Sequence, residues 1–388
     1  MKICVISNLY EPYVRGGAEE VAKIMAKGFQ KLGHEVVVVS TKPEVGVQSE
    51  ENDQMKIYRF RPMNLFYYLN DFQHNFFIRL IWRLIDIFNY HSYWTINKIL
   101  QKEKPDLVIT HNLVGLSYLL PRLIRKHRIK YIHVLHDVQL AVPSGIIIKG
   151  EEKHFLNNGF LIKIHCWVCN HLFGSPETVI SPSKWLMEFY VQRGFFKNSK
   201  QIVLPNPIKP VDSIQVKEKK NNRYLFIGQL EKHKGIDWLI NFWKKNNIKD
   251  ELWIVGLGSL SERVENEQAE SIKYLGCKRG RELGEIFKQV DFLIVPSLCY
   301  ENSPSVITLA FQNATPVMVA NIGGAAELVE NRKAGFVFEA GSEESLLNAL
   351  NEVNKISDIE YQEMSRECLV YAGEFIVDNY LNEILKET

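Results

Sequence analysis

Three short segments combine glycine with charged or hydroxyl residues in a way that suits phosphate binding. Gly16-Gly17 lies between a β-branched run and a region of helical apolar spacing, where a glycine backbone can approach a ligand at a helix N-terminus. Residues 228–235 (GQLEKHKG) offer Lys234 to a diphosphate as a point charge. Residues 301–306 (ENSPSV) precede an apolar helical run. Together they predict a phosphate-bearing ligand, although the sequence lacks both GxGxxG and Walker A motifs.

Each of these loops follows an apolar run typical of a strand buried in a parallel sheet. The first part of the chain predicts a helix over 18–32 and strands over 2–7, 35–40, 106–110, 131–135 and 178–181. The pattern restarts after the polar stretch 212–223. It then predicts helices over 236–245 and 282–290, and strands over 224–228, 252–255, 271–275, 292–295 and 315–320. This alternation predicts two α/β domains, followed by a last stretch with helical spacing.

Length and composition narrow the class of protein. A chain of 388 residues that is 46% apolar and 24% charged is globular, and at about 150 residues per domain it forms two domains or one large one. It has no run of about 18 uncharged apolar residues and no signal-peptide pattern. We therefore expect a cytoplasmic protein whose six cysteines are reduced.

The charge is unevenly distributed along the chain. Residues 1–200 hold 26 Lys+Arg against 17 Asp+Glu, a net +9, while the remainder holds 21 against 28, a net −7. A basic half favours an anionic partner such as a phosphate, a nucleic acid or an anionic lipid surface. A solvated surface that happens to carry more lysine explains the asymmetry equally well.

One segment, 65–100, departs from the α/β rhythm because it is crowded with aromatic residues and interspersed with arginines. Much of it fits an amphipathic helix. Such a helix could touch a membrane or a lipid-linked substrate, or it could belong to a packed pair that covers a sheet edge.

The fragments, in their order, resemble a known family. GGAEEVAKIMAKGFQKLGHEVVVVS, VLHDVQLAVP, VISPSKWL, VLPNPI, FIGQLEKHKGID, LWIVGLGSL and VDFLIVPSLCYENSPSVITLAFQNATPVMVA are similar to those of group-4 (GT4) retaining glycosyltransferases of the GT-B fold, with their glycosyl transferases group 1 domain. The resemblance implies two Rossmann-like α/β domains facing across a cleft. Residues 1–206 would bind the acceptor and 207–368 the nucleotide sugar, with a helix over 369–388 packing back toward the first domain.

The resemblance also implies roles for individual residues. The expected catalytic residues are His136, Glu301 and Lys234. His136 would contact the donor sugar near the reacting carbon, Glu301 the sugar hydroxyls and Lys234 the diphosphate. The expected donor-binding positions are Gly16, Gly17, Gln229, Lys234, Gly276, Cys277, Ser305, Val306 and Leu309.

Two of these positions depart from the family pattern. Gln229 stands where an arginine is usual, which removes a charged contact to the diphosphate. Leu309 stands where a second glutamate normally holds the ribose hydroxyls, and a leucine side chain cannot accept a hydrogen bond. We therefore expect donor binding to be reduced or altered.

The expected reaction moves a sugar from a UDP- or GDP-sugar to a glycan or a lipid-linked acceptor, as in surface polysaccharide or glycolipid synthesis. It would use no metal or other cofactor, because the sequence has no Asp-x-Asp and because Lys234 and helix N-termini can stabilise the leaving diphosphate. The family retains the anomeric configuration without an assigned protein base. We expect peripheral contact with the inner face of the cell membrane and no nucleic-acid partner.

Other interpretations stay open. Leu309 and Gln229 suit a catalytically degenerate GT-B module that binds a glycan or a protein, and a GT-B sugar-nucleotide epimerase is a third choice. His111 follows a strand, as an acceptor-side histidine of the family does, but it could equally be a capping residue. The segment His165–His171 (HCWVCNH) looks metal-like, yet four ligands in seven residues cannot easily reach one ion, so we predict no metal.

Overall fold

The computed structural model describes residues 1–53, 55–209, 215–330 and 333–387. The chain divides into two compact units. Unit 1 contains Met1–Gly145, His154–Lys209 and Val377–Thr388, and unit 2 contains Ile146–Lys153 and Pro210–Ile376. Residues 212–214 of the polar stretch that separates the predicted α/β patterns lie outside the described residues.

Unit 1 is built on an eight-stranded sheet. Its strands are β1 (Lys2–Ile6), β2 (Glu35–Thr41), β3 (Val47–Asn52), β4 (Met55–Phe60), β5 (Leu107–Thr110), β6 (Lys130–Val134), β7 (Thr178–Ser181) and β8 (Lys200–Val203). Their order is β3-β4-β2-β1-β5-β6-β7-β8, and only β3 pairs antiparallel to its neighbour among the described strands. The central runs ICVI and VVVV are buried on both faces, as in a doubly wound sheet.

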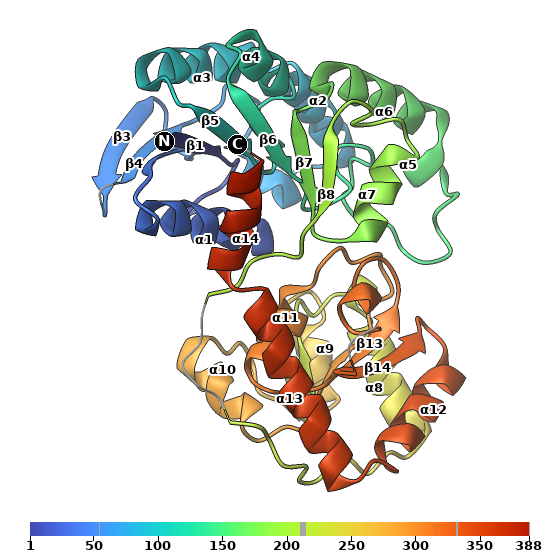
Figure 1. Ribbon diagram of the computed structural model, residues 1–388. Helices are drawn as coiled ribbons and strands as arrows, with labels where there is room; N and C mark the ends of the chain where they lie inside the picture. The colour runs from blue at the N-terminus through green and yellow to red at the C-terminus, as the bar shows by residue number, and fades with distance from the viewer. Residues whose placement is uncertain (54, 210–214, 331–332, 388) are drawn as a thin grey trace. The chain divides into compact units, whose positions relative to one another are not determined.

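Helices cover both faces of this sheet (Figure 1). They are α1 (Gly17–Lys31), the 3₁₀ helix η1 (Tyr68–Gln73), α2 (Phe76–Ile87), α3 (Tyr90–Glu103), α4 (Leu120–Lys126), α5 (Phe155–Asn158), α6 (Phe160–Phe173), α7 (Lys184–Val191) and α14 (Val377–Lys386). The aromatic segment 65–100 therefore forms the short helix η1 and the two helices α2 and α3. Among the described residues, no helix combines the length and the apolarity needed to cross a bilayer.

Unit 2 repeats the doubly wound plan on a six-stranded parallel sheet. Its strands are β9 (Tyr224–Ile227), β10 (Leu252–Val255), β11 (Ile272–Tyr274), β12 (Phe292–Val295), β13 (Val317–Asn321) and β14 (Gly335–Glu339), in the order β11-β10-β9-β12-β13-β14. The helices are η2 (Lys232–Lys234), α8 (Ile236–Lys245), α9 (Ser261–Asn266), α10 (Gly280–Phe287), α11 (Ser305–Gln312), η3 (Ala326–Leu328), α12 (Glu343–Val353) and α13 (Asp358–Glu374). The order reverses between β9 and β12, so the loops that follow these two strands meet where such sheets bind ligands.

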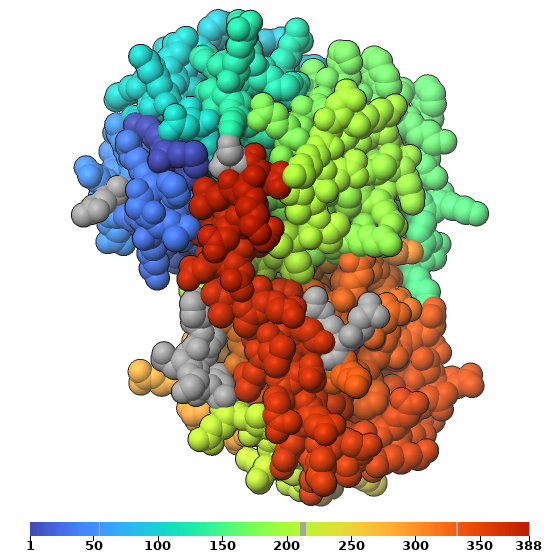
Figure 2. Space-filling view, viewed as in Figure 1, coloured from blue at the N-terminus to red at the C-terminus, as the bar shows by residue number. Residues whose placement is uncertain are grey.

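The C-terminal stretch contains two helices where the sequence predicts one over 369–388. Helix α13 belongs to unit 2 and α14 to unit 1, with a break at Phe375-Ile376. Helix α14 packs on α1 at Gly28, where a Cβ would lie 2.5 Å from Leu381 Cδ1. Figure 2 shows α14 in red on unit 1, and Lys200 pairs with Glu387 just after it. A side chain at position 28 would therefore push α14 away.

A second exchange between the units occurs at Ile146–Lys153, which the sequence does not single out. This segment belongs to unit 2, because Ile148 forms an antiparallel bridge with Cys299. The Lys149 N–H donates to the Leu298 carbonyl at 2.8 Å, and the Tyr300 N–H donates to the Ile147 carbonyl at 2.9 Å. The segment thus supports the loop that leads to Glu301.

Candidate functional site

In unit 2, the loops after β9 and β12 bring Lys234 and Glu301 together. The two strands are neighbours, with Tyr224 opposite Phe292, so both loops leave the same edge of the sheet. Lys234 Nζ lies 2.5 Å from Glu301 Oε1. The Ser297 hydroxyl donates to the same carboxylate oxygen at 2.9 Å. A paired lysine and glutamate therefore stand at the carboxyl edge of a Rossmann-like sheet.

The pair sets the charge state of the lysine. Burial lowers the pKa of Lys234, but the attraction of Glu301 outweighs burial and the pKa is raised above its ordinary value. Next to it, burial and the charge of Lys234 lower the pKa of His233. At neutral pH the loop consequently offers a charged ammonium beside a neutral imidazole.

Two glycines allow the backbone to hold this pair. Gly235 has φ +77°, and a Cβ there would lie 1.9 Å from the Pro296 carbonyl oxygen. Gly323 has φ +66°, and its Cβ would lie 2.3 Å from the Glu301 carbonyl oxygen. The neighbouring Gly324 N–H donates to that same oxygen at 2.7 Å. The positions of Lys234 and Glu301 thus depend on close backbone approaches that only glycine permits.

Helix α11 begins directly after this loop. Ser305 and Val306 occupy its first turn, where backbone N–H groups have no partner within the helix and the helix dipole favours an anion. Leu309 lies one turn further along and is half-buried. The helix start is thus suited to phosphate, whereas position 309 offers only an apolar side chain.

The other predicted donor-binding positions of unit 2 lie on neighbouring loops. Gln229 is exposed in the loop after β9. Gly256 and Gly258 pack against that loop, because a Cβ would lie 1.9 Å from the Gly228 carbonyl oxygen and 2.4 Å from that of Leu230, respectively. These two glycines are therefore packing residues. The Gly276 carbonyl accepts from the Gly256 N–H at 3.0 Å, and the next residue, Cys277, is exposed.

In unit 1, Gly16-Gly17 forms the start of α1. The Gly16 N–H donates to Glu19 Oε2 at 2.8 Å, and neither glycine has a positive φ. A Cβ on Gly17 would meet nothing within 4 Å. The fold itself therefore does not require glycine at position 17, which leaves open space at a helix N-terminus.

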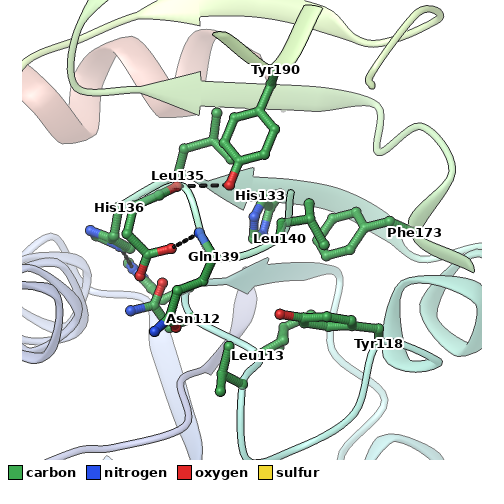
Figure 3. Close-up of a pocket in the computed structure, with 13 residues that line it drawn as sticks. Asn112, Leu113, Tyr118, His133, Leu135, His136, Gln139, Leu140, Phe173 and Tyr190 are labelled. Carbon is green, nitrogen blue, oxygen red and sulfur yellow. Dashed lines mark hydrogen bonds between the residues drawn. The ribbon is translucent and has the colours of Figure 1, made fainter. Parts of the chain in front are cut away.

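A pocket in unit 1 lies at the carboxyl ends of β5 and β6 (Figure 3). His111, which follows β5, and His136, which follows β6, stack with ring centroids 5.1 Å apart. Nδ1 of His111 lies 2.8 Å from Nε2 of His136. The structure thus brings His136 to a second histidine, the one for which the sequence offers an acceptor-side or a capping role.

Burial keeps the pocket histidines neutral. It lowers the pKa of His136 to about 4 and, together with the nearby His136, that of His133 to about 3. The pKa of His111 falls well below its usual value for the same reasons. A neutral imidazole carries one N–H, so one member of the His111–His136 pair donates and the other accepts.

Three buried polar atoms of the pocket are without a hydrogen-bond partner among the described residues: His111 Nε2, the Tyr118 hydroxyl and Gln139 Oε1. The Tyr118 hydroxyl points toward the middle of the pocket in Figure 3. The free space, about 20 Å³, holds one water-sized group. Because unsatisfied buried polar groups are costly, the site is suited to a water or to a ligand hydroxyl.

Tyr118, Gln139, Tyr190 and Ser297 are site residues that the sequence does not reveal. The Tyr190 hydroxyl donates to the Asp137 carbonyl at 2.7 Å, and the Gln139 N–H donates to Asp137 Oδ1 at 2.8 Å, which together shape the loop after His136. Gln139 follows His136-Asp137 so closely that it could have been considered. Tyr118 and Tyr190 reach the pocket only through the tertiary fold.

The predicted residues thus fall into two groups, Lys234 with Glu301 beside α11 in unit 2, and His136 with His111 in unit 1. Within the described residues, no group of three or more His, Cys, Asp or Glu side chains is arranged to hold a metal ion. His165 and Cys169 of the metal-like segment lie on one helix, α6, with Cys169 Sγ 3.5 Å from His165 Nε2.

Two Rossmann-like α/β units define the fold class, and sequence comparison identifies the family. Residues 15–211 match Glycosyltransferase Family 4, and residues 221–355 match Glycosyl transferases group 1. The chain therefore belongs to glycosyltransferase family 4, as the sequence predicts.

Two relatives and a solved structure are similar to this chain over most of its length. An uncharacterized 42.6 kDa protein in the cps region of Klebsiella pneumoniae is 25% identical, over 84% of this chain and 87% of its own length. The UDP-Gal:α-D-GlcNAc-diphosphoundecaprenol α-1,3-galactosyltransferase of Escherichia coli is 26% identical, over 78% of this chain and 79% of its own. HepE of Anabaena, solved with UDP, aligns over 100% of both chains with a TM-score of 0.69 and 17% identity. The fold is GT-B, which confirms the prediction.

Proposed function

We propose that this glycosyltransferase moves a sugar from a UDP-sugar to a lipid-linked glycan acceptor, with retention of configuration, during assembly of a surface polysaccharide. The observation that carries the proposal is the Lys234–Glu301 pair at the start of α11. The named donor and acceptor of the E. coli relative support the choice of substrates, and the cps location of the K. pneumoniae relative supports the pathway class. HepE has also been solved with UDP-glucose.

In this proposal, Lys234 binds the diphosphate. Its ammonium has three N–H donors, and the contact to Glu301 uses one of them, so the others are available to phosphate oxygens. As the bond to the sugar breaks, negative charge grows on the leaving diphosphate. Lys234 and the backbone N–H groups of Ser305 and Val306 stabilise that charge without a metal ion.

Glu301 has two tasks in the proposal. One carboxylate oxygen accepts from both Ser297 and Lys234, which fixes the orientation of the carboxylate. Its other oxygen is then directed to hydroxyl groups of the donor sugar. The same carboxylate keeps Lys234 charged despite burial.

Unit 1 supplies the acceptor side. Gly17 leaves room for a ligand at the start of α1, and His136 contacts the donor sugar near the reacting carbon. Neutral His136 is a hydrogen-bonding group rather than a cation, because its pKa is lowered to about 4. The acceptor hydroxyl attacks from the face that the diphosphate leaves, so its proton can pass to the leaving oxygen and no protein base is assigned.

Leu309 gives weight to a second candidate, a GT-B module that binds a ligand without transferring a sugar. A half-buried leucine offers no acceptor to the ribose hydroxyls.

We predict that Leu309→Glu tightens UDP binding about tenfold, because a hydrogen bond to a charged group contributes about 1.5 kcal/mol. Calorimetric titration with UDP measures this. Unchanged or weaker binding would show that the ribose site has been lost from unit 2.

The direct test of the transfer is product analysis. The purified chain is incubated with a panel of UDP-sugars and a diphosphate-lipid-linked saccharide, in the presence of EDTA. We expect release of UDP and a product whose new linkage keeps the donor's anomeric configuration by NMR. Tight UDP binding without any transfer across the panel would favour the binding module instead.

A further inference from the structure

The outer faces of α2, α5 and α6 are apolar although they are exposed to solvent. On α2, the exposed fractions of Phe76 and Phe77 are 64% and 74%. On α6, those of Phe160 and Leu161 are 76% and 75%. Phe72, Leu80, Ile81, Leu84, Phe155 and Trp167 add to this surface, which we call the apolar face. A gathering of large exposed apolar side chains on neighbouring helices is typical of a docking site.

Helix α2 buries Trp82, Asp86 and Ile87 and leaves large apolar side chains exposed on its other side. The Asp86 carboxylate is buried and accepts from the Gly115 N–H at 2.9 Å. Arg83 donates to the Pro143 carbonyl at 2.5 Å. These two bonds fix which face of α2 points outward. They also attach α2 to the loops 111–118 and 135–145, which line the histidine pocket.

Helices α2 and α6 lie on the same side of unit 1. Arg83 of α2 interacts electrostatically with His165 and Cys169 of α6, so their inner faces are neighbours. Helix α5 packs directly on α6. Figure 1 shows the three helices on the part of unit 1 that contains β7 and β8. The apolar face is therefore formed by neighbouring helices rather than by scattered side chains.

The charge of the apolar face indicates its partner. Arg79 and Lys163 are exposed on α2 and α6, while Asp86, the one acidic residue of the three helices, is buried. An anionic lipid surface complements this combination of large apolar side chains and cations. A second copy of the chain would bring the same cations together across a two-fold interface. With 12 residues, α2 is too short to span a bilayer and long enough to lie in its interface.

We propose that the apolar face docks on the interface of a bilayer that contains anionic lipid, and thereby places the loops of the histidine pocket at the membrane. The docking does not depend on the chemistry of the donor. Docking would also bring a lipid-linked acceptor to unit 1. This last point rests on the proposed function.

Flotation of the full chain with lipid vesicles tests this proposal. The vesicles are phosphatidylcholine alone, or phosphatidylcholine with about one third phosphatidylglycerol. We expect the chain to float with the anionic vesicles and to be released by high salt. The variants Phe76→Ser/Phe77→Ser and Phe160→Ser/Leu161→Ser should each lower the vesicle partition coefficient at least about tenfold. Arg79→Glu/Lys163→Glu should remove the preference for anionic vesicles.

The matched control is Ile359→Ser/Val370→Ser on α13 of unit 2, where the two side chains are also exposed, by 71% and 53%. It should float as the unchanged chain does. UDP titration and thermal unfolding of every variant show that each is folded and separate docking from donor binding. The proposal is overturned if the unchanged chain stays with the protein-only fraction, or if the control loses as much binding as the face variants. A dimer that dissociates only in the face variants, without vesicle binding, would assign the apolar face to a second copy.

Discussion

At the scale of residues, the Lys234–Glu301 contact links a carboxylate to the charge of a buried lysine. Burial alone would lower the pKa of Lys234, and Glu301 reverses that effect. A diphosphate needs a cation at the pH of the reaction, so the two side chains act as one unit. Their separation of 67 positions in the sequence hides this dependence, and only the neighbouring strands β9 and β12 reveal it.

We predict that Glu301→Gln shifts the alkaline limb of the pH–kcat/KM profile to lower pH. Without the carboxylate, burial lowers the pKa of Lys234, so the ammonium loses its proton at a lower pH. At neutral pH the lost charged contacts should reduce kcat/KM by about 10- to 100-fold. The control is Glu231→Gln on the loop of Lys234, because the Glu231 carboxylate accepts from Ser259 and not from the Lys234 ammonium. If the alkaline limb of Glu301→Gln stays at the pH of the unchanged chain, Glu301 does not maintain the charge of Lys234.

The pocket histidines predict a loss of stability in mild acid. The pKa is lowered to about 3 for His133 and to about 4 for His136, whereas an unfolded histidine titrates near pH 6.5. The contribution of the two histidines to the free energy of unfolding is complete above pH 6.5 and is lost as the pH falls toward 4. The reason is that the unfolded state then binds protons and the folded state does not. Each buried histidine adds up to about 1.4 kcal/mol per pH unit to the slope.

Urea unfolding between pH 4.5 and 8 measures this slope. In His133→Gln the free energy of unfolding should depend less steeply on pH below 6.5 than in the unchanged chain. Above pH 7 the slopes of the two proteins should coincide. Equal slopes of the two proteins below pH 6 would mean that His133 is protonated in the folded protein.

At the scale of elements, the glycines are of two kinds. Some are required by the fold, and others leave room for a ligand. Gly235→Ala should lower the free energy of unfolding by about 1–3 kcal/mol, because its positive φ and the nearby Pro296 carbonyl leave no space for a Cβ.

Gly17→Ala should leave stability unchanged or slightly raised, since its backbone is unstrained and open. If a donor or acceptor passes Gly17, the same variant loses transfer activity. Full activity in stable Gly17→Ala would remove this loop from the site.

The elements differ in how far the sequence predicts them. Continuous apolar runs such as 35–40 and 252–255 coincide with β2 and β10, because a strand buried on both faces needs no alternation. Strand β3 was not predicted, since its residues VQSEEN are mostly exposed and pair only at the sheet edge. The orientation of α2 could not be read from periodicity either. A helical period identifies the faces of a helix, and only the bonds from Asp86 and Arg83 show which of them is inside.

At the scale of the whole molecule, the order of motifs along the chain predicts the GT-B fold and the family, both of which are confirmed. The sequence alone does not predict that the units exchange short segments. Ile146–Lys153 pairs with residues 298–300 only through the tertiary fold, and α14 is separated from α13 by two residues without a glycine or a proline. The roles of the individual site residues remain predictions, which mutation of Lys234 tests first.

The central claim is that Lys234 of this glycosyltransferase binds a nucleoside diphosphate without a metal. Calorimetric titration with UDP, GDP, ADP, CMP and TDP in EDTA tests it, using the unchanged chain, Lys234→Ala and the exposed neighbour variant Lys232→Ala. We predict that UDP binds the unchanged chain and Lys232→Ala equally, and Lys234→Ala about 10- to 100-fold more weakly. UDP that binds Lys234→Ala as well as the unchanged chain, or no binding of any nucleotide without a metal, would contradict the account.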